Sequence, residues 1–441
     1  MPPPISLHDL SNLDAPARKR LTQRTEADLS VYIERVKPII EAVRTEGDVA
    51  LSRFAGELDK SQVPANAIKV RSAEFAGADA GVLPEVREAI AFAIENIRKF
   101  HEAQKPEEMW IKEVRPGVWA GDRCTPIDSV ACYVPRGKGS FPSVLMMTAI
   151  PAKVAGVPKI ALLTPPGPDG KVDAATLYAC GLIGITDVYK CGGAQAVAAV
   201  AYGTETVPKC FKIMGPGSPY VVAAKRLLSD IIDPGTPAGP SECIVLADET
   251  ADGRLAGLDL IIESEHGADS SAFLVTPSRA VAEAARAAIP TYWAQMGEQR
   301  VSFSSTVLGG QKGGIVLTRD MDEAIAFTND YAPEHLQVLT KDPWATVGRL
   351  RNAGEILMGR HTPTVLGNYV IGPNAVLPTA GWARTASPLS VFDYMKRTSL
   401  AYVTEPAHAE LAKHAHRLAI YEGFDGHALA VSDVRAKLLK G

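Results

Sequence analysis

The sequence predicts an α/β protein with two doubly wound, Rossmann-like domains, one inserted in the other, plus small N- and C-terminal helical extensions. Three observations lead to this prediction. Short apolar runs alternate with helical stretches along most of the chain, and several of these runs end at glycine, as strands do in doubly wound sheets. The chain has 441 residues, which is too long for one ordinary hydrophobic core.

The inserted domain is expected at residues 129–235. Its predicted strands are residues 130–134, 159–164, 187–191 and 211–214, separated by helical stretches. Glycine-rich turns follow three of these strands, at 136–140, 192–193 and 215–217. Because parallel sheets bind ligands at the carboxyl ends of their strands, the turns indicate a binding edge. Tight turns without a ligand explain the same glycines, and none of the three has the G-x-G-x-x-G spacing.

A second series of strands follows, and its domain is expected to be discontinuous. The predicted strands are residues 243–247, 272–275, 314–317, 335–339 and 355–358. The amphipathic helices at 28–46 and 84–104 have no strands of their own, so this sheet is expected to recruit them. The second domain is therefore assigned to residues 28–128 and 236–386, with 110–128 forming a short ribbon.

The two ends of the chain complete the assignment. Residues 1–27 are expected to form an N-terminal arm. Residues 387–441 are expected to form a small C-terminal domain, with helices at 389–396 and 407–422 and a strand-like stretch at 428–431. Because so short a tail cannot fold alone, we expect it to pack on something else, such as a partner subunit.

Composition restricts the class of protein. Hydrophobic residues make up 46% and charged residues 22%, with a net charge of −4, which is typical of a globular protein without a nucleic-acid or membrane partner. The first residues lack the pattern of a secretory signal. The six cysteines are scattered, as free thiols are in a reducing compartment. We therefore expect a cytoplasmic protein whose metal, if any, is bound by His, carboxylate or amide groups.

The stretch from Leu258 to Gly267 is the first candidate site. Glu263 and His266 are three residues apart at a predicted helix end, so both side chains lie on one face. Glu-x-x-His at this spacing can give two ligands to a divalent metal. Isolated examples are also typical of solvated acidic helix ends. Asp259 and Glu265 add negative charge nearby.

Two further clusters contain histidine. Glu334 and His335 directly precede a predicted strand, and a carboxylate beside an imidazole suits acid–base chemistry. Adjacent residues of an extended chain point in opposite directions, so both reach one pocket only if the turn after Pro333 bends them inward. A surface pair is the alternative. Glu422 and His427 lie on either side of a glycine turn near the C-terminus.

These clusters belong to a longer series of motifs in which the chain resembles the histidinol dehydrogenase family over nearly its whole length. In order, the motifs are Tyr133-Val-Pro, Gly192-Gly-Ala-Gln-Ala, Gly215-Pro-Gly, Pro237-Ala-Gly-Pro-Ser241-Glu, Glu265-His-Gly, Ala332-Pro-Glu-His335-Leu, Gly367-Asn-Tyr, Val376-Leu-Pro-Thr and Glu422-Gly-x-x-x-His427. The resemblance implies a zinc-containing, NAD-dependent enzyme that oxidises a primary alcohol to the acid through a held aldehyde. It also implies an intertwined homodimer with a shared active site, in which the C-terminal histidine reaches the partner's metal.

The resemblance also implies individual roles. Glu334 and His335 match the acid–base pair, and His335 would take the hydroxyl proton while Glu334 would activate water. The metal ligands would be Glu263, His266, Asn368 and His427, and the same four, together with Ser241, His335 and Glu422, would contact substrate. On the cofactor side, Tyr133, Gln195 and Ser218 match positions that touch NAD.

Several positions depart from the family pattern. Glu263 and Asn368 stand where the family usually has glutamine and aspartate. Together they exchange an amide and a carboxylate, so the ligand charge is unchanged and zinc is expected to be retained. Ala375 replaces a substrate-contacting histidine, and Ser218 replaces an asparagine. Arg136 and Lys138 make the first glycine turn basic, where they could meet cofactor phosphates or an anionic substrate.

Three functions follow from these observations. The family reaction is the oxidation of L-histidinol to L-histidine in histidine biosynthesis. A paralogue acting on another small amino- or hydroxy-alcohol, including anionic ones, is the alternative that Ala375 favours. A non-catalytic binding protein is the third, and the presence of Glu334, His335, His266 and His427 argues against it.

Overall fold

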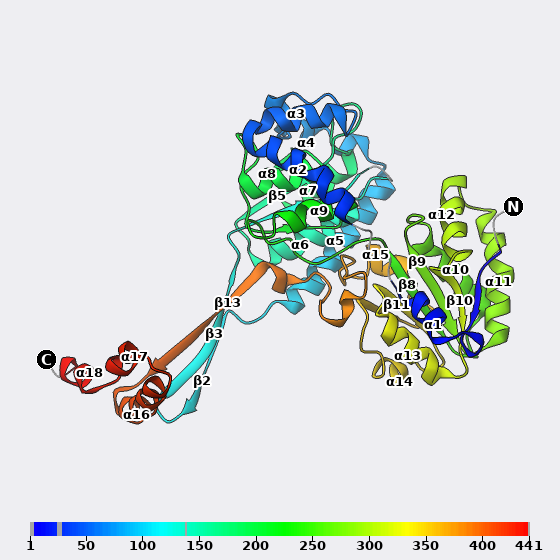
Figure 1. Ribbon diagram of the computed structural model, residues 1–441. Coiled ribbons are helices and arrows are strands. Elements are labelled where there is room, and N and C mark those ends of the chain that lie inside the picture. Colours follow the sequence, from blue (N-terminus) through cyan, green and yellow to red (C-terminus); the bar gives the residue numbers. More distant parts are fainter. Residues whose placement is uncertain (1–3, 24–28, 137–138, 440–441) are drawn as a thin grey trace. The chain divides into compact units, whose positions relative to one another are not determined.

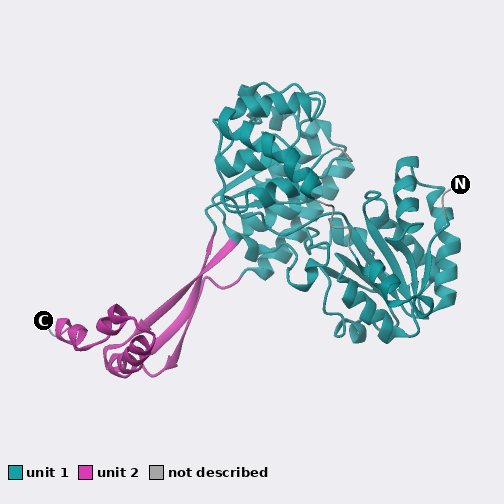
Figure 2. Cartoon of the chain, in the orientation of Figure 1, with its two compact units in different colours: residues 1–105, 127–394 teal, residues 106–126, 395–441 magenta. Residues whose placement is uncertain are grey.

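The computed structural model describes residues 4–23, 29–136 and 139–439. Two compact units divide the chain. Unit 1 comprises residues 1–105 and 127–394, and unit 2 comprises residues 106–126 and 395–441 (Figure 2). Among the described residues, no helix has the length and apolar character that a membrane crossing requires.

The first sheet of unit 1 is parallel and has four strands in the order β6-β5-β4-β7. The strands are β4 (Ser129–Tyr133), β5 (Lys159–Thr164), β6 (Val188–Lys190) and β7 (Ile213–Met214), with the helices α6 (Pro142–Ala155), α7 (Ala174–Ile183), α8 (Gly193–Tyr202) and α9 (Pro219–Leu227) along the same stretch. Strands β5 and β6 extend the sheet on one side of β4, and β7 then pairs with β4 on its other side. The predicted strands are therefore confirmed as a parallel α/β sheet (Figure 1).

The N-terminal helices pack on this four-stranded sheet, which corrects the assignment of residues 28–128 to the second domain. Helix α2 (Leu29–Glu46) and α3 (Asp48–Glu57) bury an apolar stripe in the core that contains Ala131, Leu163 and helix α8. The alanine-rich surface of α8 lets α2 approach closely, because alanine side chains are small. Helix α5 (Pro84–Gln104) packs on α6 and α7. The amphipathic pattern showed that one face is buried, but not which sheet buries it.

The second sheet of unit 1 is parallel and has six strands in the order β1-β10-β9-β8-β11-β12. The strands are β1 (Leu7–Asp9), β8 (Glu242–Ala247), β9 (Ser271–Thr276), β10 (Gly313–Leu317), β11 (His335–Leu339) and β12 (Glu355–Met358). The helices of this region are α10 (Gly253–Ser264), α11 (Arg279–Trp293), α12 (Glu298–Leu308), α13 (Met321–Tyr331), α14 (Pro343–Val347) and α15 (Thr364–Tyr369). Alternate strand residues enter two separate cores, one with α10 and α11 and one with α13.

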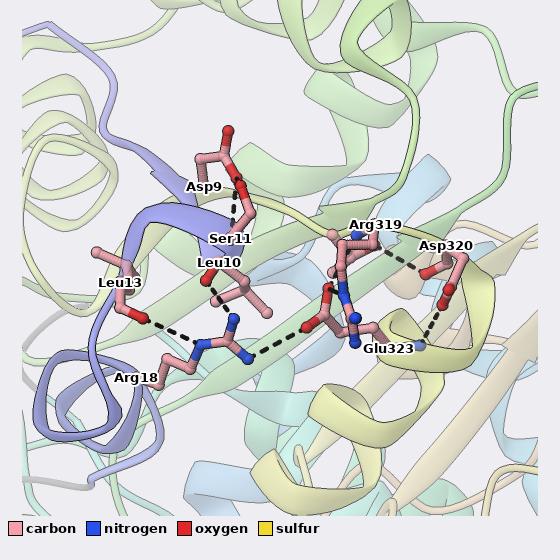
Figure 3. Close-up of polar contacts among 9 residues, drawn as sticks. Asp9, Leu10, Ser11, Leu13, Arg18, Arg319, Asp320 and Glu323 are labelled. Carbon is pink, nitrogen blue, oxygen red and sulfur yellow. Dashed lines mark hydrogen bonds and ion pairs between the residues drawn. The ribbon is translucent and has the colours of Figure 1, made fainter.

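The N-terminal arm is part of this sheet, since β1 pairs with β10 and extends it by one edge strand. Helix α1 (Ala15–Thr22) follows. Arg18 of α1 donates to the carbonyl oxygens of Leu10 and Leu13, and its guanidinium forms an ion pair of 3.1 Å with Glu323 of α13 (Figure 3). Glu323 also accepts a hydrogen bond from the Arg319 backbone N–H. The first described residues are therefore fixed to the sheet by long-range contacts.

Unit 2 contains an antiparallel sheet in the order β13-β3-β2, with β2 (Met109–Arg115), β3 (Val118–Pro126) and β13 (Met395–Val403). Unit 2 also contains the helices α16 (Glu405–Tyr421), α17 (Asp425–Ala430) and α18 (Asp433–Leu438). The expected ribbon at 110–128 is present as a hairpin. The helix expected at 389–396 is present only as a short 3-10 helix, Val391–Tyr394, because β13 begins at Met395 and pairs with β3. The strand-like stretch at 428–431 is wrong, since helix α17 covers most of it.

Candidate active site

The candidate acid–base residues lie where the strands of the six-stranded sheet begin. His335 is the first residue of β11 and Glu355 is the first residue of β12. The two residues are register partners, and His335 is also paired with Cys243 of β8. Register partners in a parallel sheet point to the same face, so the imidazole and the Glu355 carboxylate lie side by side. The site is therefore at the amino edge of this sheet.

The side chain of His335 lies between two carboxylates. Its Nδ1 is 3.2 Å from Oε2 of Glu355, and its Nε2 is 3.9 Å from Oε1 of Glu334. The Glu242 backbone N–H donates a 2.8 Å hydrogen bond to Glu334. Both Glu334 and His335 are buried, which excludes the alternative of a surface pair. The bend that brings them together follows Ala332, which has a φ of +52°.

Burial and charge change the proton affinities of this pair. The pKa of Glu334 is raised to about 8, mainly by burial; the neighbouring His335 opposes the shift and the charge of Glu263 adds to it. Burial alone would lower the pKa of His335, but the charge of Glu263, the hydrogen bond to Glu355 and the charge of Glu334 together raise it to about 9. The buried carboxylates thus favour a positive charge at this place.

Glu263, His266, Asn368 and Ser241 are brought together at the end of α10. Asn368 of α15 donates a 2.9 Å hydrogen bond from Nδ2 to Oε1 of Glu263. Nδ1 of His266 is 3.3 Å from Oε2 of the same carboxylate. The hydroxyl of Ser241 also hydrogen-bonds to Glu263. Burial would raise the pKa of Glu263, but His266, His335 and these hydrogen bonds hold it below its usual value. The side chains do not belong to a merely solvated helix end, because Glu263 is 1% exposed.

These residues fit a divalent cation in the chemistry of their donors. Glu263 offers a carboxylate and His266 an imidazole, and rotating the Asn368 amide would present its oxygen in place of its nitrogen. Within the described part of the chain, no group of three or more His, Cys, Asp and Glu side chains is close enough to hold a metal ion. An amide ligand falls outside that set, and His427, the fourth expected ligand, belongs to unit 2.

Glu422 and His427 share one surface of unit 2. Both line a groove of about 610 Å³ between α16 and α17, together with Leu418 and Phe424. The rings of Phe424 and His427 have centroids 5.0 Å apart. Leu418 and Phe424 are more than half exposed, so this groove is an apolar surface with an acid and an imidazole on it.

The expected cofactor residues lie at the carboxyl edge of the four-stranded sheet. Tyr133 ends β4, and its hydroxyl accepts a 3.1 Å hydrogen bond from the Gly193 N–H at the start of α8. Gly215 follows β7 with a φ of +119°, and a Cβ there would overlap the Tyr133 carbonyl oxygen. Glycine is therefore needed for this close approach. The turns after β4, β6 and β7 meet at one place.

The other residues expected on the cofactor side occupy the same edge. Gln195 is buried in the first turn of α8, and its Oε1 has no hydrogen-bond partner among the described residues. Ser218 is exposed at the N-cap of α9, where its side chain caps no backbone N–H. Arg136 is exposed after β4, and its guanidinium donates to the Lys171 carbonyl oxygen at 3.5 Å. Lys138 lies outside the described residues.

Ala375 is half-buried in the segment after α15. Its neighbour Asn374 is buried and donates a 2.6 Å hydrogen bond to the Met147 carbonyl oxygen. Asn374 also lies 3.2 Å from the imidazole of His101. The backbone at position 375 is therefore well fixed, while its side chain is only a methyl group.

Sequence reasoning missed Glu242 and Glu355. Glu242 begins β8, and its Oε1 accepts a hydrogen bond from the Ala380 N–H. Each is a single carboxylate at the start of a strongly apolar strand. That position is the signal that could have found them, because a buried carboxylate must have a partner.

Comparison with known proteins places these features in a family. The sequence model of histidinol dehydrogenase matches residues 22–435. A histidinol dehydrogenase homolog of Mesorhizobium japonicum is 63% identical over 437 residues, covering 99% of each chain. A histidinol dehydrogenase of Synechocystis is 49% identical, covering 96% of this chain and 98% of the relative. The crystal structure of histidinol dehydrogenase from Elizabethkingia anophelis is 33% identical with a TM-score of 0.93, covering 99% of each chain.

These matches and the mixed α/β fold with parallel sheets define the chain as an oxidoreductase. It belongs to the histidinol dehydrogenase family.

Proposed function

We propose that this protein oxidises a small primary alcohol to the carboxylic acid through a bound aldehyde, with zinc and NAD, as histidinol dehydrogenase does. The observation that carries the proposal is the buried position of His335 between Glu334 and Glu355, beside the cluster around Glu263. A proton acceptor and carboxylates held together out of water are suited to acid–base chemistry at an alcohol. A purely structural core would not require so many buried charges.

Glu263, His266 and Asn368 are the residues of unit 1 that would hold the metal, and we propose His427 as the fourth ligand. A bound dication would polarise and orient the oxygen of the substrate. The half-exposed His266 and the Ser241 hydroxyl are near enough to Glu263 to contact a substrate bound there.

His335 is proposed to take the hydroxyl proton at Nε2, since Nδ1 is engaged by Glu355. Glu334 is proposed to activate water for attack on the aldehyde, because burial gives its carboxyl group the high proton affinity that a general base needs. NAD, when bound, supplies the hydride acceptor in each of the two oxidations. Tyr133, Gln195 and Ser218 are proposed to hold it, and the orphaned Oε1 of buried Gln195 supports this because it leaves an acceptor available for a ligand.

The apolar groove of unit 2 supports a homodimer with a shared active site. Glu422 and His427 lie on this exposed surface, which is lined mostly by apolar groups. Such surfaces mark interaction sites on proteins. We propose that the partner subunit covers it, so that His427 and Glu422 serve the partner's site.

Release of NADH with L-histidinol and with a panel of other primary alcohols tests the proposal. The panel should include amino-, hydroxy- and acid-substituted alcohols. Turnover of one of them to the acid, strongly reduced by Glu334→Gln and by His335→Asn, is the expected result. A protein that binds NAD and zinc but oxidises no alcohol of the panel would indicate a non-catalytic binding protein instead.

A second candidate concerns the substrate. Ala375 removes the imidazole that would contact histidinol, and the relatives of 60% identity or more carry the name homolog rather than histidinol dehydrogenase. These observations favour a paralogue whose substrate is another small amino- or hydroxy-alcohol, including anionic ones. A higher kcat/KM for such an alcohol than for L-histidinol would establish it.

A further inference from the structure

The carboxylate of Glu355 is held against the ring nitrogen of His335 that faces away from Glu334. Its Oε2 lies 3.2 Å from Nδ1, and the two side chains belong to register partners of neighbouring strands. The backbone fixes this pair as well. Glu355 donates its N–H to the Glu334 carbonyl oxygen at 2.9 Å, and Gly354 donates to Pro333. The sheet therefore holds the backbones of the two residues side by side, so that the imidazole and the carboxylate can meet on one face.

The carboxylate is enclosed on its other side. Glu355 is 8% exposed, and its Oε1 has no hydrogen-bond partner among the described residues. A Cβ at Gly367 of α15 would lie 2.8 Å from both carboxylate oxygens. The helix that carries Asn368 is thus packed closely against Glu355, and a larger residue at position 367 would require the Glu355 carboxylate to shift. A buried carboxylate with one idle oxygen costs stability, which a purely structural role does not explain.

We propose that Glu355 is a positioning residue: it holds His335 by Nδ1, keeps the proton on that nitrogen, and leaves Nε2 directed at Glu334 and the reacting hydroxyl. A carboxylate that fixes the tautomer of a basic histidine has this effect in other enzymes. The inference rests on the proposed role of His335 as the base. Glu355 itself touches neither substrate nor cofactor in this assignment.

Glu355→Gln tests the inference, because it keeps the size of the side chain and removes its charge. With the alcohol found to be turned over, kcat is expected to fall by about 10- to 100-fold, with little change in KM. The rising limb of the pH–rate profile is expected to move to lower pH, since the imidazole loses a neighbouring negative charge. A general loss of folded protein would lower the rate without moving that limb.

Asp259→Asn is the matched control. Asp259 is a buried carboxylate that accepts a 2.6 Å hydrogen bond from Gln337, on the same strand as His335. Removing its charge should leave the pH profile in place. A second control combines Glu355→Gln with His335→Asn. Residues that act as a unit are non-additive, so the double variant should be no slower than His335→Asn alone.

A measurement without substrate separates this inference from the proposed function. In ¹⁵N-histidine-labelled protein, the His335 signal is identified by its loss in His335→Asn. Its titration should move to lower pH in Glu355→Gln and stay in place in Asp259→Asn, even if no alcohol is oxidised. A titration unchanged by Glu355→Gln, multiplicative rate losses in the double variant, or a Glu355→Gln protein that no longer folds would each overturn the assignment.

Discussion

Asn368 donates a 2.9 Å hydrogen bond to Glu263, so the two expected metal ligands at which this chain departs from the predicted family pattern are in direct contact. The contact explains why the departures occur together. The carboxylate at one position accepts a hydrogen bond from the neutral amide at the other, whereas a carboxylate at both would place two like charges side by side.

The first prediction concerns variants in which the carboxylate and the amide at positions 263 and 368 are replaced singly or exchanged. Asn368→Asp alone should weaken zinc binding or alter its pH dependence, because it adds a second carboxylate beside Glu263. Glu263→Gln alone removes the only carboxylate of the set and should weaken zinc by at least about 10-fold. The double variant restores the charge and should bind zinc better than either single variant. Metal analysis after dialysis measures this, with Glu265→Gln as a control in the same helix end. Additive losses in the double variant would contradict the pairing.

Glu334→Gln should impair the second oxidation more than the first, because water activation is needed only after the aldehyde has formed. Feeding the aldehyde directly and following NADH measures the second step alone, and a fall of about 100-fold or more is expected. Aldehyde oxidation at the wild-type rate in this variant would show that another group activates the water.

The pKa of His335 should depend on the metal. In metal-free protein it is raised to about 9, so the charged imidazole adds stability that is fully present below its ordinary pKa of about 6.5 and is lost as the pH rises through 9. A dication near Glu263 repels that proton. Adding zinc should therefore lower the pKa of His335 in an NMR titration, and calcium, which these ligands bind poorly, should have little effect. An identical titration with and without zinc would place the metal elsewhere.

Ala375→His should raise kcat/KM for L-histidinol by about 10-fold or more, since it returns an imidazole to the substrate side. The preferred alcohol of the wild-type protein should lose a comparable factor. Ala375→Leu, which adds bulk without a hydrogen-bonding group, is the control. If histidine and leucine at position 375 had equal effects on every alcohol tested, position 375 would not determine the substrate.

The free energy of unfolding should fall steeply as the pH rises into the alkaline range. Burial raises the pKa of Cys132 to about 12, that of Cys210 to about 11, and those of Cys180, Cys191 and Cys243 above the usual value. A raised pKa in the folded state means stability that is present below about pH 9 and lost above it. Each thiol contributes a slope of about 1.4 kcal/mol per pH unit. Urea unfolding between pH 7 and 10 measures the slope, and Cys132→Ala should reduce it.

The strands of both parallel sheets could be predicted because each is a short apolar run with turn residues at its ends. Strand β13 could not, since its residues are mostly exposed and its four polar residues are consecutive, at 396–399, which breaks any alternation of apolar and polar positions. Its pairing with β3 also joins segments far apart in the sequence. Helix α2 was recognised by its stripe, but its partner was not, because a stripe carries no information about the surface that covers it.

The residues of the candidate site could likewise be predicted only in part. Glu263, His266, Glu334 and His335 were identified from local spacing and from resemblance, and the structure places them together. Glu355 was not identified, because its proximity to His335 depends on the register between β11 and β12. The rule that ligands bind at carboxyl edges suits the four-stranded sheet, whereas the acid–base residues of the six-stranded sheet occupy its amino edge.

The edge position of β1 has a consequence for biosynthesis. Residues 7–9 leave the ribosome before their partners in β10, which are residues 315–317. At roughly 5 to 20 residues per second, the ribosome needs about 15 to 60 s to make the chain between them. Throughout that interval the β1 segment lacks the strand with which it pairs, so a chaperone that shields this segment would raise the yield of native protein.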